Sequence, residues 1–247
     1  MHALILQHIA CEPPGVYEEV LRERGWELRR VELDEGEPIG DWREADAIVA
    51  MGGPMSVNDE REHPWLVEEK RAIREAVTEG TPFWGACLGV QLLASSLGAR
   101  VYPGPEPEVG LITVTLTEAA RADPVFDGLP SEPLTLQWHG DTFDLPDGAV
   151  LLAGSAAFPH QAFRVGRMAY GVQFHLEVSR EMAAAWAEVP AYSAALDRVL
   201  GPGALEGLLE QMDGAADGMR SHGRAMFERW LDLLAQPGNG ERPVSRR

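Results

Sequence analysis

The N-terminal part of the chain alternates short apolar runs with amphipathic segments, and this alternation limits the folds open to it. Residues 3–6, 45–51 and 82–86 have the length and composition of buried strands. Residues 65–79 and 88–97 instead carry apolar side chains at helical spacing. Strands that alternate with helices predict a parallel sheet with helices on both faces. The expected fold class is therefore α/β, with an open and mostly parallel sheet.

The character of the sequence changes after this first part. Residues 99–175 carry strand-like runs separated by turn signals, and they predict an antiparallel extension of the sheet. From Ser179 onward the chain is rich in alanine and has helical spacing. We expect residues 1–190 to form the main domain, 191–235 to form a C-terminal helical extension of it, and 236–247 to form a flexible tail.

Composition excludes several classes of partner. Lys and Arg total 21 against 39 Asp and Glu, which gives a formal charge of −18. Such acidity disfavours nucleic acid and anionic membrane surfaces. The two cysteines fit a reducing compartment, and the sequence has no signal peptide and no apolar run of about 20 residues. We expect a cytoplasmic protein with no metal and no cofactor, because the sequence lacks paired-cysteine and His-x-x-x-His spacing.

A candidate nucleophile lies at the junction of a predicted strand and a predicted helix. Residues 84–89 (WGACLG) place Cys87 between Gly85 and Gly89, the pattern of a nucleophile elbow. Glycines fit a sharp turn, and the partial positive charge of a helix N-terminus favours a thiolate. The alternative is a buried structural cysteine. Cys11 lacks this context and is interpreted as a loop or core thiol.

A histidine and a carboxylate follow the last predicted strand. In an extended chain, residues i and i+2 point to the same side, so His175 and Glu177 can face one pocket. A carboxylate can orient an imidazole and stabilise the imidazolium. With Cys87, the two residues would complete a set of nucleophile, base and orienting group. Without the elbow, an ordinary surface ion pair would be the better interpretation.

Two further segments bear on substrate binding. Residues 51–54 (MGGP) follow a buried strand, and they form either a plain turn or part of an oxyanion hole. In the second case the N–H groups of Gly53 and Leu88 would be the donors. Gln91 lies four residues after Cys87 on the same helix face, where it can reach a bound substrate or remain solvated.

Four segments, in order, carry a resemblance to a known family. Residues 52–57, 85–91, 139–141 and 171–177 match the motifs of the class I glutamine amidotransferases. The chain is most similar to stand-alone relatives of the glutaminase domain of GMP synthetase. The match has the expected spacing over most of the chain, which makes it specific. The family fold is an open, mostly parallel sheet with helices on both sides.

The resemblance implies a reaction. Cys87 would attack the side-chain amide carbon of glutamine, while the N–H groups of Gly53 and Leu88 hold the oxyanion. His175, oriented by Glu177, would protonate the departing ammonia and later activate water. The γ-glutamyl thioester on Cys87 would then be released as glutamate.

The resemblance also implies substrate contacts and shows two departures from the family. Gln91, His139 and Asp141 match positions that help to bind glutamine, although a core role is the alternative for His139. Leu176 replaces the usual proline, and we expect a less restrained turn there. Trp138 replaces a smaller serine and is expected to change what fits the pocket.

Three functions remain open at this point. The chain is a glutaminase that supplies ammonia to a synthetase partner, or a γ-glutamyl hydrolase or peptidase, or a non-catalytic binding or regulatory protein on the same scaffold. The sequence contains no Gly-rich phosphate loop, so we expect that it does not make GMP alone. The substrate under the first two hypotheses is glutamine or a γ-glutamyl conjugate.

Overall fold

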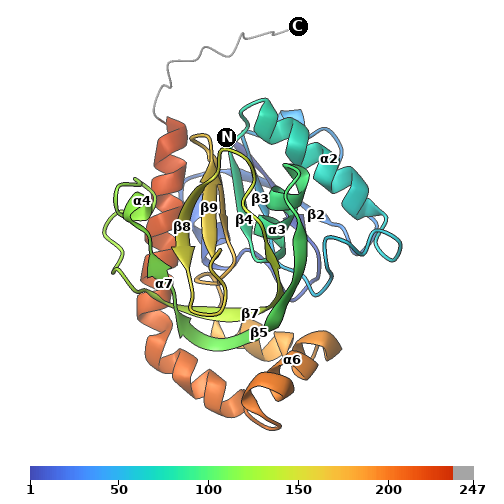
Figure 1. Cartoon of the computed structure of the whole chain (residues 1–247). Coiled ribbons are helices and arrows are strands. Elements are labelled where there is room, and N and C mark those ends of the chain that lie inside the picture. Colours follow the sequence, from blue (N-terminus) through green and yellow to red (C-terminus); the bar gives the residue numbers. More distant parts are fainter. Residues whose placement is uncertain (236–247) are drawn as a thin grey trace, which may run out of the picture.

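One mixed sheet organises the molecule (Figure 1). The computed structural model describes residues 1–235. The eight strands of the main sheet follow the order β2-β1-β3-β4-β10-β9-β8-β6. The first five of these strands are parallel, and β9, β8 and β6 extend the sheet in antiparallel fashion. This arrangement confirms the predicted fold class.

The strands are short in the main sheet and long in a second, two-stranded sheet formed by β5 and β7. The strands are β1 (His2–Gln7), β2 (Glu27–Glu32), β3 (Ala47–Ala50), β4 (Phe83–Ala86), β5 (Val101–Thr113), β6 (Thr115–Leu116), β7 (Leu134–Phe143), β8 (Val150–Gly154), β9 (Ala162–Val165) and β10 (Ala169–Val172).

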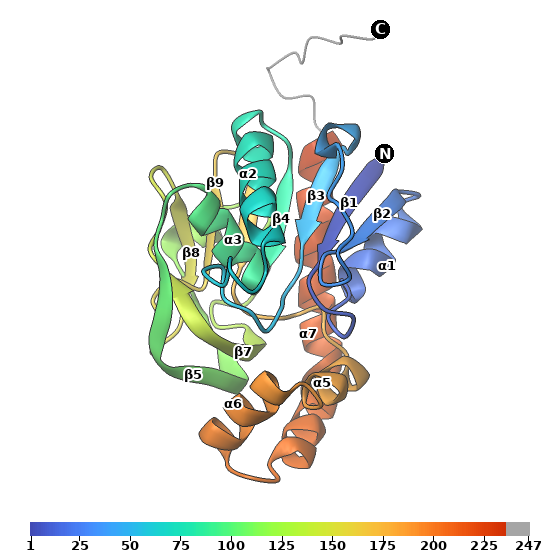
Figure 2. The same ribbon diagram turned by 90° about the vertical axis from the view of Figure 1, so that its right-hand side faces the viewer.

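Helices cover both faces of the main sheet, with α2 and α3 on one side and α1 and α7 on the other (Figure 2). Within residues 1–235, no helix is both long and apolar enough to cross a membrane. The helices are α1 (Val16–Glu23), the 3₁₀ turn η1 (Trp42–Glu44), α2 (Trp65–Thr78), α3 (Leu88–Ser96), α4 (Glu118–Arg121), α5 (Arg180–Trp186), α6 (Pro190–Leu200) and α7 (Leu205–Ala235).

The alternation of side chains along β1 explains why both faces need cover. Ala3 and Ile5 belong to the core beneath α1 and α7, whereas Leu4 and Leu6 belong to the core beneath α2 and α3. All four side chains are at most 1% exposed. A strand that is apolar on both faces is typical of the centre of a parallel sheet.

The middle of the chain differs from the expected single extension of the sheet. Alternation of apolar and polar residues over 111–117 predicts one strand, but these residues divide between the end of β5 and β6, and β5 pairs with β7 rather than with the main sheet. The helical C-terminal region is confirmed, with a 31-residue α7 as its longest element. The predicted tail, 236–247, lies outside the described residues.

Four neighbouring parallel strands send their following loops to one edge of the sheet. Strands β1, β3, β4 and β10 are consecutive in the parallel part, and their carboxyl ends lead into residues 8–15, 51–57, 87 and 173–178 respectively. Ligands of open α/β sheets bind at this edge. All the candidate catalytic and oxyanion residues lie in these four segments or directly beside them.

Helix α7 contains a glycine whose replacement should stabilise the protein. A Cβ atom added at Gly214 would meet nothing within 4 Å, and the residue is exposed. Alanine in a helix interior is favoured over glycine by about 0.5–1 kcal/mol. We expect Gly214→Ala to raise the free energy of unfolding by about this amount, measured by urea denaturation. A decrease would mean that α7 is not helical at this position in solution.

Candidate functional site

Cys87 occupies a strained turn between β4 and α3. Its φ is +53°, and it is the only non-glycine residue with positive φ among those described. A Cβ atom at Gly85 would lie 2.6 Å from the backbone of Gly89, and one at Gly89 would lie 2.1 Å from the carbonyl oxygen of Ala50. Real Cβ atoms do not approach backbone so closely, so both positions require glycine. This geometry is the one that the elbow motif predicts.

His175 and Glu177 lie beside the Cys87 thiol. The His175 Nδ1 and Glu177 Oε1 atoms are 2.6 Å apart, and the His175 ring is hydrogen-bonded to Cys87. Glu177 is held in turn by the hydroxyl of Tyr17, which donates to its carboxylate. All three predicted triad side chains are at most 5% exposed. The structure therefore brings together the residues that the two motifs singled out.

Leu176, between these two residues, is held by a hydrogen bond and by packing against α7. The Leu176 N–H donates to Glu177 Oε2 over 3.0 Å, a bond that proline could not make. The Leu176 side chain is 2% exposed, and its backbone lies so close to Gly223 of α7 that a Cβ there would be 2.8 Å from the Leu176 oxygen.

The electrostatics suit proton transfer from Cys87 to His175. Burial lowers the pKa of the His175 imidazole, but the Glu177 carboxylate and the hydrogen bond to Cys87 outweigh it and hold the pKa well above its ordinary value. Burial raises the pKa of the Cys87 thiol, and the hydrogen bond from His175 opposes this effect. A more basic imidazole is a better acceptor for the thiol proton.

The segment 51–54 lies across the elbow, as an oxyanion role requires. A Cβ atom at Gly52 would lie 3.5 Å from the Cys87 Cβ, and one at Gly53 would lie 3.0 Å from the Leu88 side chain. Within residues 1–235, the structure gives no hydrogen-bond acceptor to the N–H of Gly53 or of Leu88. Two free amides beside a buried thiol are suited to hold a developing oxyanion.

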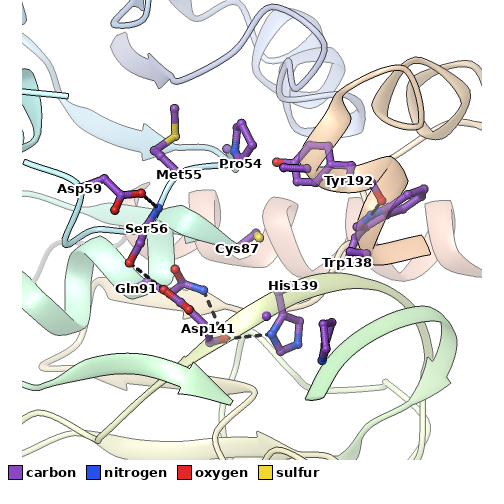
Figure 3. A pocket seen from close by; sticks show the side chains of 15 residues that line it. Pro54, Met55, Ser56, Asp59, Cys87, Gln91, Trp138, His139, Asp141 and Tyr192 are labelled. Atoms are coloured by element: carbon purple, nitrogen blue, oxygen red, sulfur yellow. Dashed lines mark hydrogen bonds between the residues drawn. The ribbon is translucent and has the colours of Figure 1, made fainter. Parts of the chain in front are cut away.

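A pocket of about 330 Å³ opens above the thiol (Figure 3). Cys87 lies between the loop that carries Pro54 and Met55 and the strand that carries Trp138 and His139. The wall opposite Gln91 comes from α6, through Tyr192 among others. A cavity of this size takes a small substrate such as an amino acid.

The three predicted substrate contacts all line this pocket. Gln91 donates to Gln173 Oε1 over 3.0 Å, and Asp141 Oδ2 accepts from the Ser56 hydroxyl over 2.7 Å. His139 Nδ1 lies 3.0 Å from the Asp141 carbonyl oxygen. His139 and Asp141 lie inside β7. Their roles in substrate binding stay predictions.

A buried carboxyl that the sequence did not predict lies beside the thiol. Glu12 is 2% exposed, and its Oε2 occupies the space where a Gly52 side chain would be. The Tyr192 hydroxyl donates to Glu12 Oε1, which joins the first loop of the chain to α6. Burial raises the pKa of Glu12, and the neighbouring His175 opposes the rise. No local motif marks either residue, since they are 180 positions apart.

Aromatic side chains complete the wall near the imidazole. The Trp186 ring from α5 packs edge-on against His175, with ring centroids 4.7 Å apart, and donates from Nε1 to the Cys11 oxygen over 2.9 Å. Trp138 packs against Trp186 and donates from Nε1 to the Tyr192 oxygen over 3.1 Å. Trp138 therefore lines the pocket and also contacts the C-terminal helices α5 and α6.

The Glu12 carboxylate should make the Cys87 thiol harder to ionise. Its negative charge contributes to the raised pKa of Cys87. We expect Glu12→Gln to move the rise of iodoacetamide alkylation to lower pH, since removing an anion lowers the thiol pKa. The measurement is the pH profile of the alkylation rate. Tyr192→Phe is the matched control because it removes the hydroxyl and keeps the charge. Equal profiles for wild type and Glu12→Gln would contradict the expectation.

No group of three or more His, Cys, Asp and Glu side chains in the described part of the chain has metal-binding geometry. The site is thus described by its thiol, imidazole, carboxyl and amide groups. Such a set can carry out acyl transfer through a thioester.

Comparison with known proteins agrees with this fold. The family model for glutamine amidotransferase class-I matches residues 16–185, and the chain belongs to this family. It is 36% identical over 188 residues to the glutamine amidotransferase-like protein YfeJ of Salmonella typhimurium, which covers 73% of this chain and 77% of that protein.

Other relatives include a multidomain synthase and two solved structures. The chain is 33% identical over 170 residues to a glutamine-hydrolyzing GMP synthase of Streptococcus pyogenes, covering 66% of this chain but 29% of the synthase. A glutamine amidotransferase of Thermotoga maritima matches with a TM-score of 0.84 and 32% identity, covering 94% of this chain and 98% of that one. One from Methylobacillus flagellatus has a TM-score of 0.84 and 26% identity, covering 97% and 98%.

Proposed function

We propose that the protein hydrolyses the side-chain amide of glutamine in the cytoplasm, using Cys87 as nucleophile, His175 as base and acid, and Glu177 as the orienting carboxylate. His175 takes the thiol proton, and the thiolate attacks the amide carbon. The tetrahedral oxyanion is held by the N–H groups of Gly53 and Leu88. It collapses to a γ-glutamyl thioester while His175 protonates the departing ammonia. Water then releases glutamate and restores the thiol.

One observation carries this proposal. A thiol at positive φ, hydrogen-bonded to an imidazole that a buried carboxylate orients, faces a pocket large enough for an amino acid. The pocket lining includes the carboxylate of Asp141 and the amide of Gln91, which are suited to the α-ammonium and α-carboxylate of glutamine respectively. Membership of the class I glutamine amidotransferases supports the same reaction.

The test is glutamate and ammonia release from L-glutamine by the purified protein, measured alongside L-asparagine and a set of γ-glutamyl amides. We expect both products from glutamine in equal amounts and none from asparagine, whose side chain is one methylene shorter. Preferential cleavage of γ-glutamyl conjugates would instead identify a γ-glutamyl hydrolase. No turnover of any γ-glutamyl compound would reject the proposal.

A synthetase partner that consumes the ammonia is part of the proposal. A relative in Streptococcus pyogenes is named as a glutamine-hydrolyzing GMP synthase, and this chain matches 29% of it. Release of ammonia is useful where a second active site captures it. A pull-down followed by glutaminase assay, with and without the captured protein, would show whether such a partner raises the rate of hydrolysis.

A further inference from the structure

A buried histidine contacts the peptide unit that carries one of the two oxyanion amides. His8 follows β1 and is 0% exposed. Its Nδ1 lies 3.1 Å from the carbonyl oxygen of Gly52, and its Nε2 lies 2.9 Å from Glu69 Oε1 of α2. The Trp65 ring stacks on the imidazole, with centroids 5.6 Å apart. The ring thus has one fixed orientation between a carbonyl and a carboxylate.

The Gly52 carbonyl oxygen can accept a hydrogen bond but cannot donate one. The same holds for the Glu69 carboxylate when it is ionised. Both contacts are satisfied together when each ring nitrogen carries a hydrogen, and His8 is then a cation. Burial lowers the pKa of His8, but Glu69 and the Gly52 carbonyl outweigh it, with a smaller contribution from Glu12, so the pKa is raised. Glu69 and Glu12 are the two titratable groups that face the ring.

The carbonyl of Gly52 and the N–H of Gly53 belong to the same peptide unit. Resonance couples the two ends of a peptide, so a proton donor at the oxygen draws electrons from the nitrogen. Hydrogen bonds in a chain strengthen one another for this reason, and a charged donor has the larger effect. A Cβ at Gly53 would lie 2.9 Å from the His8 Cβ, which shows how closely the ring and this peptide are packed.

We propose that His8 and Glu69 are positioning residues for the oxyanion hole, in which cationic His8 fixes the Gly52–Gly53 peptide and makes the Gly53 N–H a stronger donor to the oxyanion. This inference rests on the proposed acyl-transfer chemistry at Cys87. It assigns no contact between His8 and the substrate. The effect falls on the step that creates negative charge on oxygen, and reactions of Cys87 without such a charge are unaffected.

Two reagents that react with the Cys87 thiol distinguish a reaction that forms an oxyanion from one that does not. p-Nitrophenyl acetate acetylates a thiolate through a tetrahedral oxyanion and releases p-nitrophenolate. Iodoacetamide alkylates the thiolate by displacing iodide, and no oxyanion forms. A Cys11→Ala background leaves Cys87 as the one thiol in the sequence. The ratio of acylation to alkylation rates then reports oxyanion stabilisation and cancels changes in thiolate content.

Two substitutions of His8 each keep one of its two hydrogen bonds and remove the other. His8→Gln places an amide nitrogen near the former Nε2 position, which keeps the contact with Glu69 and loses the one with Gly52. His8→Asn places its nitrogen near Nδ1, which keeps a neutral donor to Gly52. We expect His8→Gln to lower the ratio about tenfold or more, a smaller loss than removal of a whole oxyanion donor. His8→Asn should lower it about threefold.

His63→Gln is the matched control. His63 lies on α2's N-terminal side with its ring 5.4 Å from that of Trp65, and it has no contact with Gly52. The ratio of acylation to alkylation rates in His63→Gln should equal that of the parent protein. On glutamine, His8→Gln should lower kcat by a similar factor with little change in KM, since ground-state binding does not involve the oxyanion.

Glu69→Gln adds a pH readout. The His8 cation is present below its folded pKa and lost above it, and removing the Glu69 charge lowers that pKa. The acylation-to-alkylation ratio should therefore decrease as the pH rises, and the midpoint of this decrease should lie at a lower pH in Glu69→Gln than in the parent protein. A shift in the opposite direction, or none, would overturn the role of charge.

The outcomes separate the two proposals. If glutamine is not hydrolysed but the ratio falls in His8→Gln, the assignment of substrate is wrong and this inference stands. If the ratio is unchanged in His8→Gln, the inference is overturned whatever the glutaminase result. If acylation and alkylation fall in equal proportion, His8 acts only on the elbow structure, and the inference is likewise overturned.

Discussion

Cys87→Ser is expected to lower kcat for L-glutamine hydrolysis by about six orders of magnitude, the scale on which removing a nucleophile acts. The serine hydroxyl is far less acidic than a thiol, so the same imidazole cannot ionise it to a useful extent. The substitution replaces one atom at a buried position and leaves the elbow backbone intact. The measurement is single-turnover glutamate release. Trapping with hydroxylamine should yield γ-glutamyl hydroxamate from the wild type alone.

Cys11→Ala is the matched control for this result. Cys11 is partly buried, its pKa is raised to about 11 mainly by burial, and its backbone oxygen accepts a hydrogen bond from Trp186 Nε1. It should retain wild-type kcat and hydroxamate formation. Full activity of Cys87→Ser would remove the basis of the proposed mechanism.

Gly89→Ala is expected to cause a large loss of stability. The new Cβ would lie 2.1 Å from the Ala50 oxygen and 2.8 Å from the Ala50 carbonyl carbon, both backbone atoms of β3. Because β3 is a central strand and can shift only at a large cost in free energy, α3 has to move away from the sheet. Overpacking of this kind costs about 3 kcal/mol or more. The free energy of unfolding from urea denaturation measures the effect.

The loss of activity should exceed the loss of folded protein, because α3 begins at Leu88 and Cys87 is its N-cap. Gly140→Ala is the control for stability, since a Cβ there meets nothing within 4 Å and the residue is exposed. It should change the free energy of unfolding by less than about 0.5 kcal/mol. A stable Gly89→Ala protein would show that β3 and α3 are not packed this closely.

Local patterns were enough to predict the parts of the site that are close in sequence. Cys87 is marked by the glycines of its own turn, and His175 and Glu177 are two residues apart in an extended segment. They meet in the structure because β4 and β10 are neighbouring parallel strands, whose carboxyl ends lie at one edge of the sheet. The fold class was likewise predictable, because alternating strands and helices leave few arrangements.

The remaining features depend on tertiary contacts that no local pattern records. No sequence motif surrounds Glu12 or Tyr192. The role inferred for His8 depends on its contacts with Gly52 and Glu69, which are 44 and 61 positions away. Alternation along residues 111–117 indicates which side is buried, not which strand is the partner, so the separate β5–β7 sheet was not foreseen. The glycines of α7 concealed its length, yet its buried apolar face against α1 and β5 stabilises the helix.

The hydrogen bond from Tyr192 to Glu12 joins a late part of the chain to an early one, so the order of synthesis determines when the pocket is completed. Ribosomes synthesise chains from the N-terminus, so the thiol, imidazole and carboxylate all exist before α5 and α6 emerge. Until those helices dock, water reaches the imidazole from the side that Trp186 later covers. The nascent chain therefore carries the reactive groups without the dry pocket that strengthens their interactions. Docking of α5 and α6 therefore completes the walls of this pocket late in synthesis.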